Sequence, residues 1–300
     1  MLSNEIIRIA PEVAAAVTAH KPMVALESTV IAHGLPKPTN LETAFHLEAI
    51  VRQHDVLPAT AAVISGRLCI GLSDAELQLL AEDGDIKKIS TRDLPIAVAN
   101  GWNGATTVAS SCWIAHRAGI NVFATGGIGG VHRGTLPDVS ADLPELARTP
   151  IIVVCSGAKI VLDLPATREW LETHGVSVVG YQCDEMPAFY SSRSTLPVDV
   201  RADTPADVAR IFHMQRALGL NNALLVTVPV PPESEVPSTQ LQTVLDRSLA
   251  EAKKARISGR ELTPFLLTYM ARNSGGATLR ANIALLENNV RVAAEIARSL

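Results

Sequence analysis

The stretch Ile151–Cys155 (IIVVC), with Ser156-Gly157-Ala158-Lys159 directly after it, decides the fold. Its apolar residues follow one another without alternation, which is typical of a strand buried on both faces of a parallel sheet. Working outward in both directions, further short strands are predicted at Pro22–Glu27 (PMVALE), Ala59–Ile64, Arg67–Ile70, Asn121–Ala124, Val176–Gly180 and Asn222–Val228. Ser65-Gly66 predicts a turn that pairs Ala59–Ile64 with Arg67–Ile70.

Helical stretches separate most of these strands. Asn40 is expected to cap a helix over 41–54, and Ser73-Asp74-Ala75-Glu76 has the pattern of a capping box. Further helices are expected at Thr106–Ala118 before Gly119, Pro165–His174 before Gly175, and Thr204–Leu218. After a Pro-rich loop at Pro229–Pro237, only helices are expected from about Gln240 onward. Together these patterns predict one α/β domain over residues 1–300: a three-layer α/β/α sandwich with a largely parallel central sheet and C-terminal helices.

Composition narrows the class of protein. The 300 residues are 47% hydrophobic and have a net charge of −4. The sequence lacks the dense Lys/Arg cluster that is typical of nucleic-acid-binding proteins. No basic and apolar leader and no long uncharged apolar run is found, so neither secretion nor membrane insertion is expected. The cysteines are scattered and form no CxxC pair, which disfavours structural zinc and fits a reducing compartment. We therefore expect a cytoplasmic enzyme.

The segment Thr125–Gly134 (TGGIGGVHRG) is the strongest local feature. It follows a predicted strand and has five glycines between Gly126 and Gly134. Glycines let backbone N–H groups approach an anion, and Thr125, His132 and Arg133 add donors. The pattern is neither a Walker A loop nor GxGxxG. Contact with a phosphate or a sugar is the favoured interpretation, and a flexible turn is the alternative.

The segment Asp138–Leu143 (DVSADL) places two carboxylates four residues apart. Oxygen ligands of this kind suit a hard cation such as Mg²⁺ or Mn²⁺. Asp and Ser are also ordinary residues at a helix N-terminus, and the residues alone slightly favour that interpretation over a metal site.

Two charged residues follow predicted strands directly. Glu27 ends PMVALE, where a carboxyl group can act as a general acid or simply form a salt bridge. Lys159 comes just after IIVVC, where a partly desolvated amine can serve as a nucleophile, although most lysines are surface charges. Lys88, in Lys87–Pro95 (KKISTRDLP), is either a phosphate ligand or one of a basic pair on a turn. Ligands of parallel α/β sheets bind at the carboxyl ends of the strands, which favours a site for Glu27 and Lys159.

Taken together, several segments resemble the pseudouridine-5′-phosphate glycosidase family along nearly the whole chain. They are ALESTVIAHGLPKPTN (Ala25–Asn40), KKISTRDLP (Lys87–Pro95), GATTVASS (Gly104–Ser111), FATGGIGGVHRG (Phe123–Gly134), DVSADL (Asp138–Leu143), CSGAK (Cys155–Lys159) and LRANIALLENN (Leu279–Asn289). The resemblance implies a lyase-type C-glycosidase that reversibly splits pseudouridine 5′-phosphate into uracil and ribose 5-phosphate. It also implies an α/β/α core, a homotrimer and one Mn²⁺ ion per subunit.

The resemblance assigns roles residue by residue. Glu27 matches the family's proton donor and Lys159 its nucleophile, while Asp138 matches the Mn²⁺ ligand. The residues that match substrate contacts are Lys88, Val108, Ser140, Ala141, Asp142, Thr125, His132 and Asn282. The stretch Gly134–Asp138 is shorter than expected for the family, so whether Asp138 or Asp142 binds the metal directly stays open.

The residue types agree with this chemistry. A C-glycosidic bond has no heteroatom leaving group. Its cleavage therefore needs a group that stabilises the electron-poor sugar C1′ and a proton for the uracil carbon. A lysine imine can supply the first and a carboxylic acid the second. Two alternatives remain: a sugar or nucleoside kinase, against which the missing Walker A motif argues, and a non-catalytic sugar-phosphate sensor, against which Glu27 and Lys159 argue.

Overall fold

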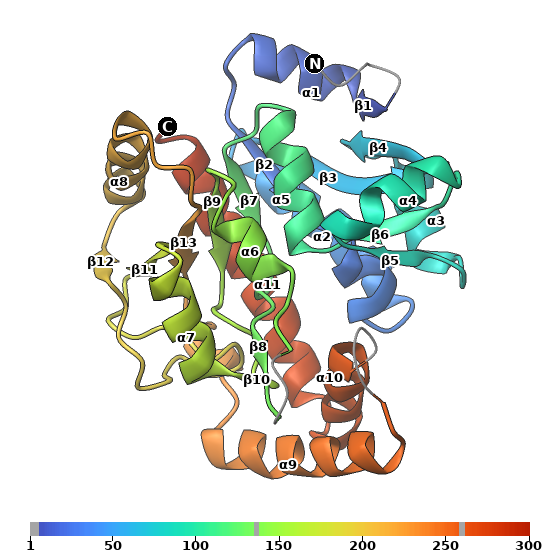
Figure 1. The fold of residues 1–300 in the computed structure, drawn as a ribbon, viewed down its shortest axis with the longest axis vertical. Helices are drawn as coiled ribbons and strands as arrows, with labels where there is room; N and C mark the ends of the chain where they lie inside the picture. Colours follow the sequence, from blue (N-terminus) through green and yellow to red (C-terminus); the bar gives the residue numbers. More distant parts are fainter. Residues whose placement is uncertain (1–5, 135–137, 258–261) are drawn as a thin grey trace.

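The computed structural model describes residues 6–134, 138–257 and 262–300. Its main feature is a mixed sheet that runs through the whole molecule (Figure 1). In spatial order, the strands are β1 (Ile7–Ile9), β4 (Arg67–Ile70), β3 (Leu57–Ile64), β2 (Met23–Leu26), β7 (Val122–Ala124), β9 (Ile152–Cys155), β13 (Leu224–Thr227), β11 (Ser177–Tyr181) and β12 (Val200–Ala202). β6 (Gly104–Thr106) branches off β3 and pairs with β5 (Lys87–Ile89).

The centre of this sheet is parallel. Every pairing from β3 through β2, β7, β9, β13 and β11 to β12 is parallel, whereas β4 and β6 pair with β3 in the antiparallel sense. β9, the IIVVC strand, lies between β7 and β13 and is fully buried. The predicted α/β fold with a largely parallel sheet and C-terminal helices is confirmed, including the hairpin at Ser65-Gly66.

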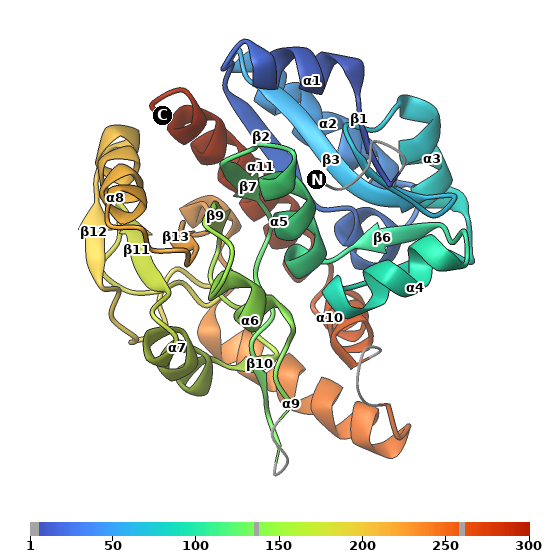
Figure 2. The same ribbon diagram turned by 45° about the horizontal axis from the view of Figure 1, so that its top comes forward.

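Helices cover both faces of the sheet (Figure 2). α5 (Val108–Arg117) packs on β2, β3 and β4, and α11 (Ala277–Ala297) runs along β2, β7 and β9 on the opposite face beside α2 (Thr39–Gln53). The remaining α-helices are α1 (Pro11–Thr18), α3 (Asp74–Glu82), α4 (Leu94–Ala99), α6 (Asp142–Leu146), α7 (Leu164–Thr173), α8 (Pro205–Ala217), α9 (Ser238–Lys254) and α10 (Leu262–Asn273). Short helical turns lie at η1 (Val30–Gly34), η2 (Thr91–Asp93) and η3 (Pro232–Ser234), and β8 (Val131–His132) pairs with β10 (Leu162–Asp163).

The last helix, α11, is held by the core. Its buried apolar residues include Leu285, Leu286, Val290 and Ile296, each at most 2% exposed. Burying one such side chain contributes about 1.5–3 kcal/mol, so this face fixes the helix firmly against the parallel strands. α9 and α10 instead pack on each other near the carboxyl ends of these strands (Figure 1).

Two local expectations were wrong. Asn40 lies inside α2 rather than before it, and its buried amide donates to the carbonyl oxygens of Ile31 at 2.9 Å and Ala81 at 3.1 Å. The side chain therefore ties α2 to two neighbouring elements instead of capping its own helix. Thr106 belongs to β6, and the helix expected from Thr106 begins at Val108, because Thr106 pairs with Ile89 of β5. No helix in the described part of the chain is long and apolar enough to cross a bilayer.

Candidate active site

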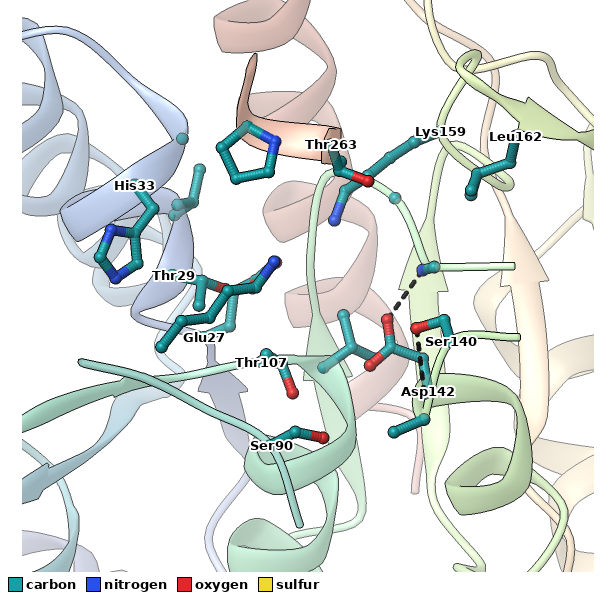
Figure 3. A pocket seen from close by; sticks show the side chains of 18 of the residues that line it. Glu27, Thr29, His33, Ser90, Thr107, Ser140, Asp142, Lys159, Leu162 and Thr263 are labelled. Carbon is teal, nitrogen blue, oxygen red and sulfur yellow. Dashed lines mark hydrogen bonds between the residues drawn. The ribbon is translucent and has the colours of Figure 1, made fainter. Parts of the chain in front are cut away.

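A cavity of about 370 Å³ opens at the carboxyl ends of β2, β7 and β9 (Figure 3). Ten of the eleven predicted site residues line it, and they come from distant parts of the chain. They are Glu27, Lys88, Val108, His132, Asp138, Ser140, Ala141, Asp142, Lys159 and Asn282. The structure therefore gathers at one place the side chains that the sequence singled out separately.

Glu27 follows β2 and is almost completely buried, with 7% of its surface exposed. Its Oε2 atom accepts a hydrogen bond from the hydroxyl of Thr29, and its Oε1 atom accepts one from the hydroxyl of Thr125. Thr125, which is predicted to contact the substrate, is 2% exposed, is not among the residues that line the cavity, and has its hydroxyl on Glu27. Both oxygens of the carboxylate are thus held in place by neutral donors.

Lys159 extends into the cavity from the loop after β9 (Figure 3). This loop is joined to the glycine-rich loop after β7 by backbone hydrogen bonds: Ser156 N–H donates to Gly126 at 2.9 Å, Ile128 N–H to Gly157 at 3.0 Å, and Lys159 N–H to Ile128 at 3.2 Å. The parallel ladder of β7 and β9 therefore continues beyond the strands and fixes the main chain at Lys159. Beside it, burial raises the pKa of Cys155 to about 12, so this thiol stays protonated and does not compete as a nucleophile.

The glycine-rich loop is packed tightly rather than free. A Cβ atom on Gly127 would lie 2.7 Å from the ring of Phe189, and one on Gly129 would lie 2.7 Å from Asp142 Oδ2. Real Cβ atoms essentially never come so close to other heavy atoms. The glycines are needed because neighbouring side chains contact the backbone directly, which disfavours the interpretation as a flexible turn.

Asp142 holds two parts of the site together. Its Oδ1 atom accepts a hydrogen bond from Ala109 N–H at 2.9 Å, and its Oδ2 atom accepts one from Gly129 N–H at 2.8 Å. The buried carboxylate therefore joins the first turn of α5, where Val108 lines the cavity, to the glycine-rich loop. Ser140 supports it by accepting a 3.3 Å hydrogen bond from Asp142 N–H (Figure 3).

Few side chains of the cavity could bind a divalent cation. In residues 6–134, 138–257 and 262–300, no group of three or more His, Cys, Asp or Glu side chains is placed to hold a metal ion. Both carboxylate oxygens of Asp142 are already hydrogen-bonded, whereas Asp138 is exposed and also lines the cavity. The donors present fit a hard cation that takes one carboxylate, with waters or substrate oxygens as its other ligands. Residues 135–137, part of the short stretch before Asp138, lie outside the described residues.

Basic groups approach the cavity from three further elements. Lys88 lies in β5, where its neighbour Lys87 is exposed and pairs with Asp85 at 2.5 Å, so the two lysines have different surroundings. His132 lies in β8, and its pKa is lowered by burial and by Lys88 and Lys159, although Asp138 opposes the shift. His33 in η1 also lines the cavity, and burial followed by the charge of Lys88 lowers its pKa. Both imidazoles are therefore predominantly neutral near pH 7.

Several residues of the site were not foreseen. Thr29 and His33 stand in the quoted segment Ala25–Asn40 but carry no signal of their own. Asn289 is fully buried in α11, where its Nδ2 group donates to Thr125 O at 2.8 Å and its Oδ1 atom accepts from Ser156 Oγ at 3.2 Å. α10 adds one wall of the cavity through Thr263, Pro264 and Leu267. Sequence patterns do not show which face of a late helix meets a site formed by early strands.

Comparison with known proteins identifies the family of this chain. A model of the family described as indigoidine synthase A like protein matches residues 12–299, and the chain belongs to this class of α/β proteins. Within the class, it is a member of the pseudouridine-5′-phosphate glycosidase family.

Relatives of that name are similar over most or nearly all of their length. The pseudouridine-5′-phosphate glycosidase of Methylobacterium nodulans is 49% identical over 100% of this chain and 89% of its own. The protein of that name from Escherichia coli K12 is 47% identical over 99% and 96% of the two chains.

Solved structures agree with the fold. The prealnumycin C-glycosynthase AlnA, described in complex with ribulose 5-phosphate, superposes with a TM-score of 0.91 and 37% identity over 99% of this chain and 98% of its own. An indigoidine synthase A-like protein from Thermotoga maritima gives 0.90 and 38% identity over 97% and 95% of the two chains.

Proposed function

We propose that this protein reversibly cleaves the C1′–C5 bond of pseudouridine 5′-phosphate, with water, to give uracil and ribose 5-phosphate. The observation that carries the proposal is the convergence of Glu27 and Lys159, which follow two different strands of the parallel sheet, on one cavity. The names of the relatives indicate that the substrate is pseudouridine 5′-phosphate. A neighbour named as a C-glycosynthase in complex with a pentulose phosphate supports the same class of ligand.

The proposed reaction passes through a covalent adduct of Lys159. The Lys159 amine adds at C1′ and opens the ribose ring, whose O4′ takes a proton. Glu27 then gives its proton to uracil C5, and the C1′–C5 bond breaks with its electron pair restoring the uracil double bond. The lysine nitrogen lone pair forms the C1′=N bond of a protonated imine at the same time. Water hydrolyses this protonated imine, which releases ribose 5-phosphate and the free amine, and the proton set free returns to Glu27.

The phosphate is assigned to the basic part of the cavity. Lys88 and His132, together with the backbone of the glycine-rich loop Gly126–Gly134, offer charged and neutral donors on one side. Val108, Ser140, Ala141 and Asn282 line the remaining surface and are assigned to contacts with sugar and base. Binding energy from the remote phosphate can be used for distortion at the reacting carbon.

Asp138 is assigned as the carboxylate ligand of one Mn²⁺ ion. When bound, the ion would neutralise negative charge on the substrate. Asp142 is assigned to hold the loop and helix that surround it, since both its oxygens accept backbone hydrogen bonds. A homotrimer in the cytoplasm is proposed on family grounds alone, and light scattering that gives the monomer mass would contradict the assembly.

The direct test follows free uracil by chromatography after incubation with pseudouridine 5′-phosphate and Mn²⁺. Uracil release without ATP supports the proposal, and its absence would leave a sugar-phosphate sensor. The phosphate site is tested in the same assay with pseudouridine, which should give a kcat/KM about ten- to hundredfold lower because a hydrogen bond to a charged group is lost. Equal values for nucleoside and nucleotide would exclude the assigned phosphate site.

A further inference from the structure

Glu27 must exist in two protonation states if it donates a proton to carbon, and this inference rests on that proposed role. A carboxyl group that is 7% exposed needs hydrogen-bond partners in both states, because an unpaired buried polar group is costly. The ionised form needs donors at its oxygens. The protonated form needs an acceptor whenever its proton is not directed at the substrate.

Thr29 has partners suited to both states. Its Oγ1 atom lies in hydrogen-bond contact with Glu27 Oε2 and, on another side, 3.2 Å from the carbonyl oxygen of Thr106. A hydroxyl group has one hydrogen and two lone pairs, so it donates to only one of these acceptors at a time. Thr125, by contrast, makes its hydroxyl contact with the other carboxylate oxygen, Oε1.

The Thr106 carbonyl is a fixed partner. Thr106 N–H donates to Ser28 Oγ at 2.9 Å, and Thr106 Oγ1 donates to the carbonyl oxygen of Ala61 at 2.7 Å. These buried contacts anchor the residue to β3 and to the end of β2. The carbonyl oxygen is therefore available to Thr29 in a constant position.

We propose that Thr29 is a positioning residue whose hydroxyl changes its acceptor with the protonation state of Glu27. When Glu27 is ionised, Thr29 donates to Oε2. When Glu27 is protonated, Oε2 donates to Thr29 Oγ1 and Thr29 donates to the Thr106 carbonyl. Rotation about one C–O bond thus satisfies the carboxyl group before and after it gives its proton to uracil C5. Thr29 keeps its own hydrogen throughout.

The test compares Thr29→Val, which keeps the shape but removes the hydroxyl, with Thr29→Ser, which keeps the hydroxyl. Thr60→Val is the matched control, because Thr60 also donates to a glutamate, Glu48, at 2.6 Å, but outside the cavity. We expect Thr29→Val to lower kcat roughly ten- to hundredfold with little change in KM, the range for losing a hydrogen bond to a charged group. Thr29→Ser should restore most of the rate, and Thr60→Val should keep it.

A second measurement separates proton transfer from the rest of the reaction. Borohydride reduction with ribose 5-phosphate reports imine formation at Lys159, which does not need the proton of Glu27, so Thr29→Val should give the wild-type amount of adduct. The inference is overturned if Thr29→Val keeps a kcat within twofold of wild type, if its adduct falls in parallel with its rate, or if Thr29→Ser is equally slow. Thr29→Ala replaces Thr29→Val should the latter not fold. An inactive wild-type enzyme would instead refute the proposed function.

Discussion

Asn289 on α11 donates a 2.8 Å hydrogen bond to the carbonyl oxygen of Thr125, the residue whose hydroxyl holds Glu27. The same side chain accepts a hydrogen bond from Ser156, which stands three residues before Lys159. One buried amide of the last helix thus joins the ends of β7 and β9, where the two proposed reactive groups are positioned.

Replacing Asn289 by alanine should therefore affect both stability and rate. The change leaves the Thr125 carbonyl and the Ser156 hydroxyl buried without this partner, and each unsatisfied group costs about 1–3 kcal/mol. We expect a fall of that order in the free energy of unfolding, measured with urea, and a lower kcat. Asn288→Ala is the control, because Asn288 is half-buried on the same helix and contacts Pro229 and Arg291 away from these loops. Equal effects of the two substitutions would argue against the assigned role.

Lys159 should be the site of covalent attachment. Borohydride added to enzyme and ribose 5-phosphate should fix a ribose-phosphate adduct on the peptide that carries Lys159, as mass spectrometry would show. Lys159→Ala should lose adduct and turnover, whereas Glu27→Gln should lose turnover and keep the adduct, since imine formation does not need the proton for uracil. An adduct found on Lys88 would remove Lys159 from the mechanism.

Gly129→Ala should damage the site through sterics alone. The added methyl group would lie 2.6 Å from Ser140 Cβ and 2.7 Å from Asp142 Oδ2. Both residues hold the loop, Asp142 through Gly129 N–H and Ser140 through the carbonyl oxygen of Gly130. Overpacking of this kind typically costs about 1–3 kcal/mol, so a lower unfolding midpoint and a raised KM are expected. Gly84→Ala places its methyl group in open space and serves as the control. A Gly129→Ala enzyme with wild-type KM would show that the loop is not required in this form.

The two aspartates should respond differently to substitution. Asp138→Ala removes the proposed metal ligand and should raise the Mn²⁺ concentration needed for half-maximal activity while leaving the unfolding midpoint nearly unchanged. Asp142→Ala removes the acceptor of two backbone hydrogen bonds and should mainly destabilise the fold. Both variants would be titrated with Mn²⁺ after EDTA treatment. Full wild-type activity in EDTA, or a metal effect confined to Asp142→Ala, would contradict the assignment.

Histidine burial should make stability increase as the pH rises toward the unfolded histidine pKa of about 6.5. Burial, followed by a nearby cation, lowers the pKa of His33 and of His116: Lys88 acts on His33, and Arg216 with Arg117 on His116. Below the unfolded value of about 6.5, the unfolded chain then binds more protons than the folded one. Stability from this source is complete above that pH and is lost as the pH falls toward the folded pKa values. Urea midpoints should rise less steeply with pH in the double variant His33→Gln/His116→Gln than in the wild type. Equal slopes in the two proteins would contradict this prediction.

The parallel sheet could be predicted because its strands carry their signal locally. PMVALE and IIVVC are short and continuously apolar, and both are buried strands in the fold. β5 (KKI), β6 (GAT) and β12 (VRA) were not predicted because, unlike the equally short β7 (VFA), none of them is a continuous apolar run. Their pairing depends on partners far away in the sequence. Asn40 shows the same limit, since its side chain is used by η1 and α3 rather than by its own helix end.

The residues of the candidate site likewise include some that could be predicted from the sequence and some that could not. Glu27 and Lys159 could be selected because a charged residue at the end of an apolar strand is visible in the sequence. Thr29, Asn289 and the α10 residues could not be selected, because their importance comes only from contacts across the fold. The hydrogen bonds that Asp142 accepts from Ala109 and Gly129 could also be recognised only from the three-dimensional structure.

The cavity takes its walls from both ends of the chain: Glu27 follows the second strand, and Thr263 and Asn282 lie in the last two helices. A ribosome that has made the whole parallel sheet has therefore not yet made a closed site. Until α10 and α11 emerge and dock, the nascent chain lacks the cavity residues that these helices supply. We therefore expect catalytic competence to be acquired late in synthesis, together with the completed core, and an interrupted chain is not expected to carry out the proposed imine chemistry.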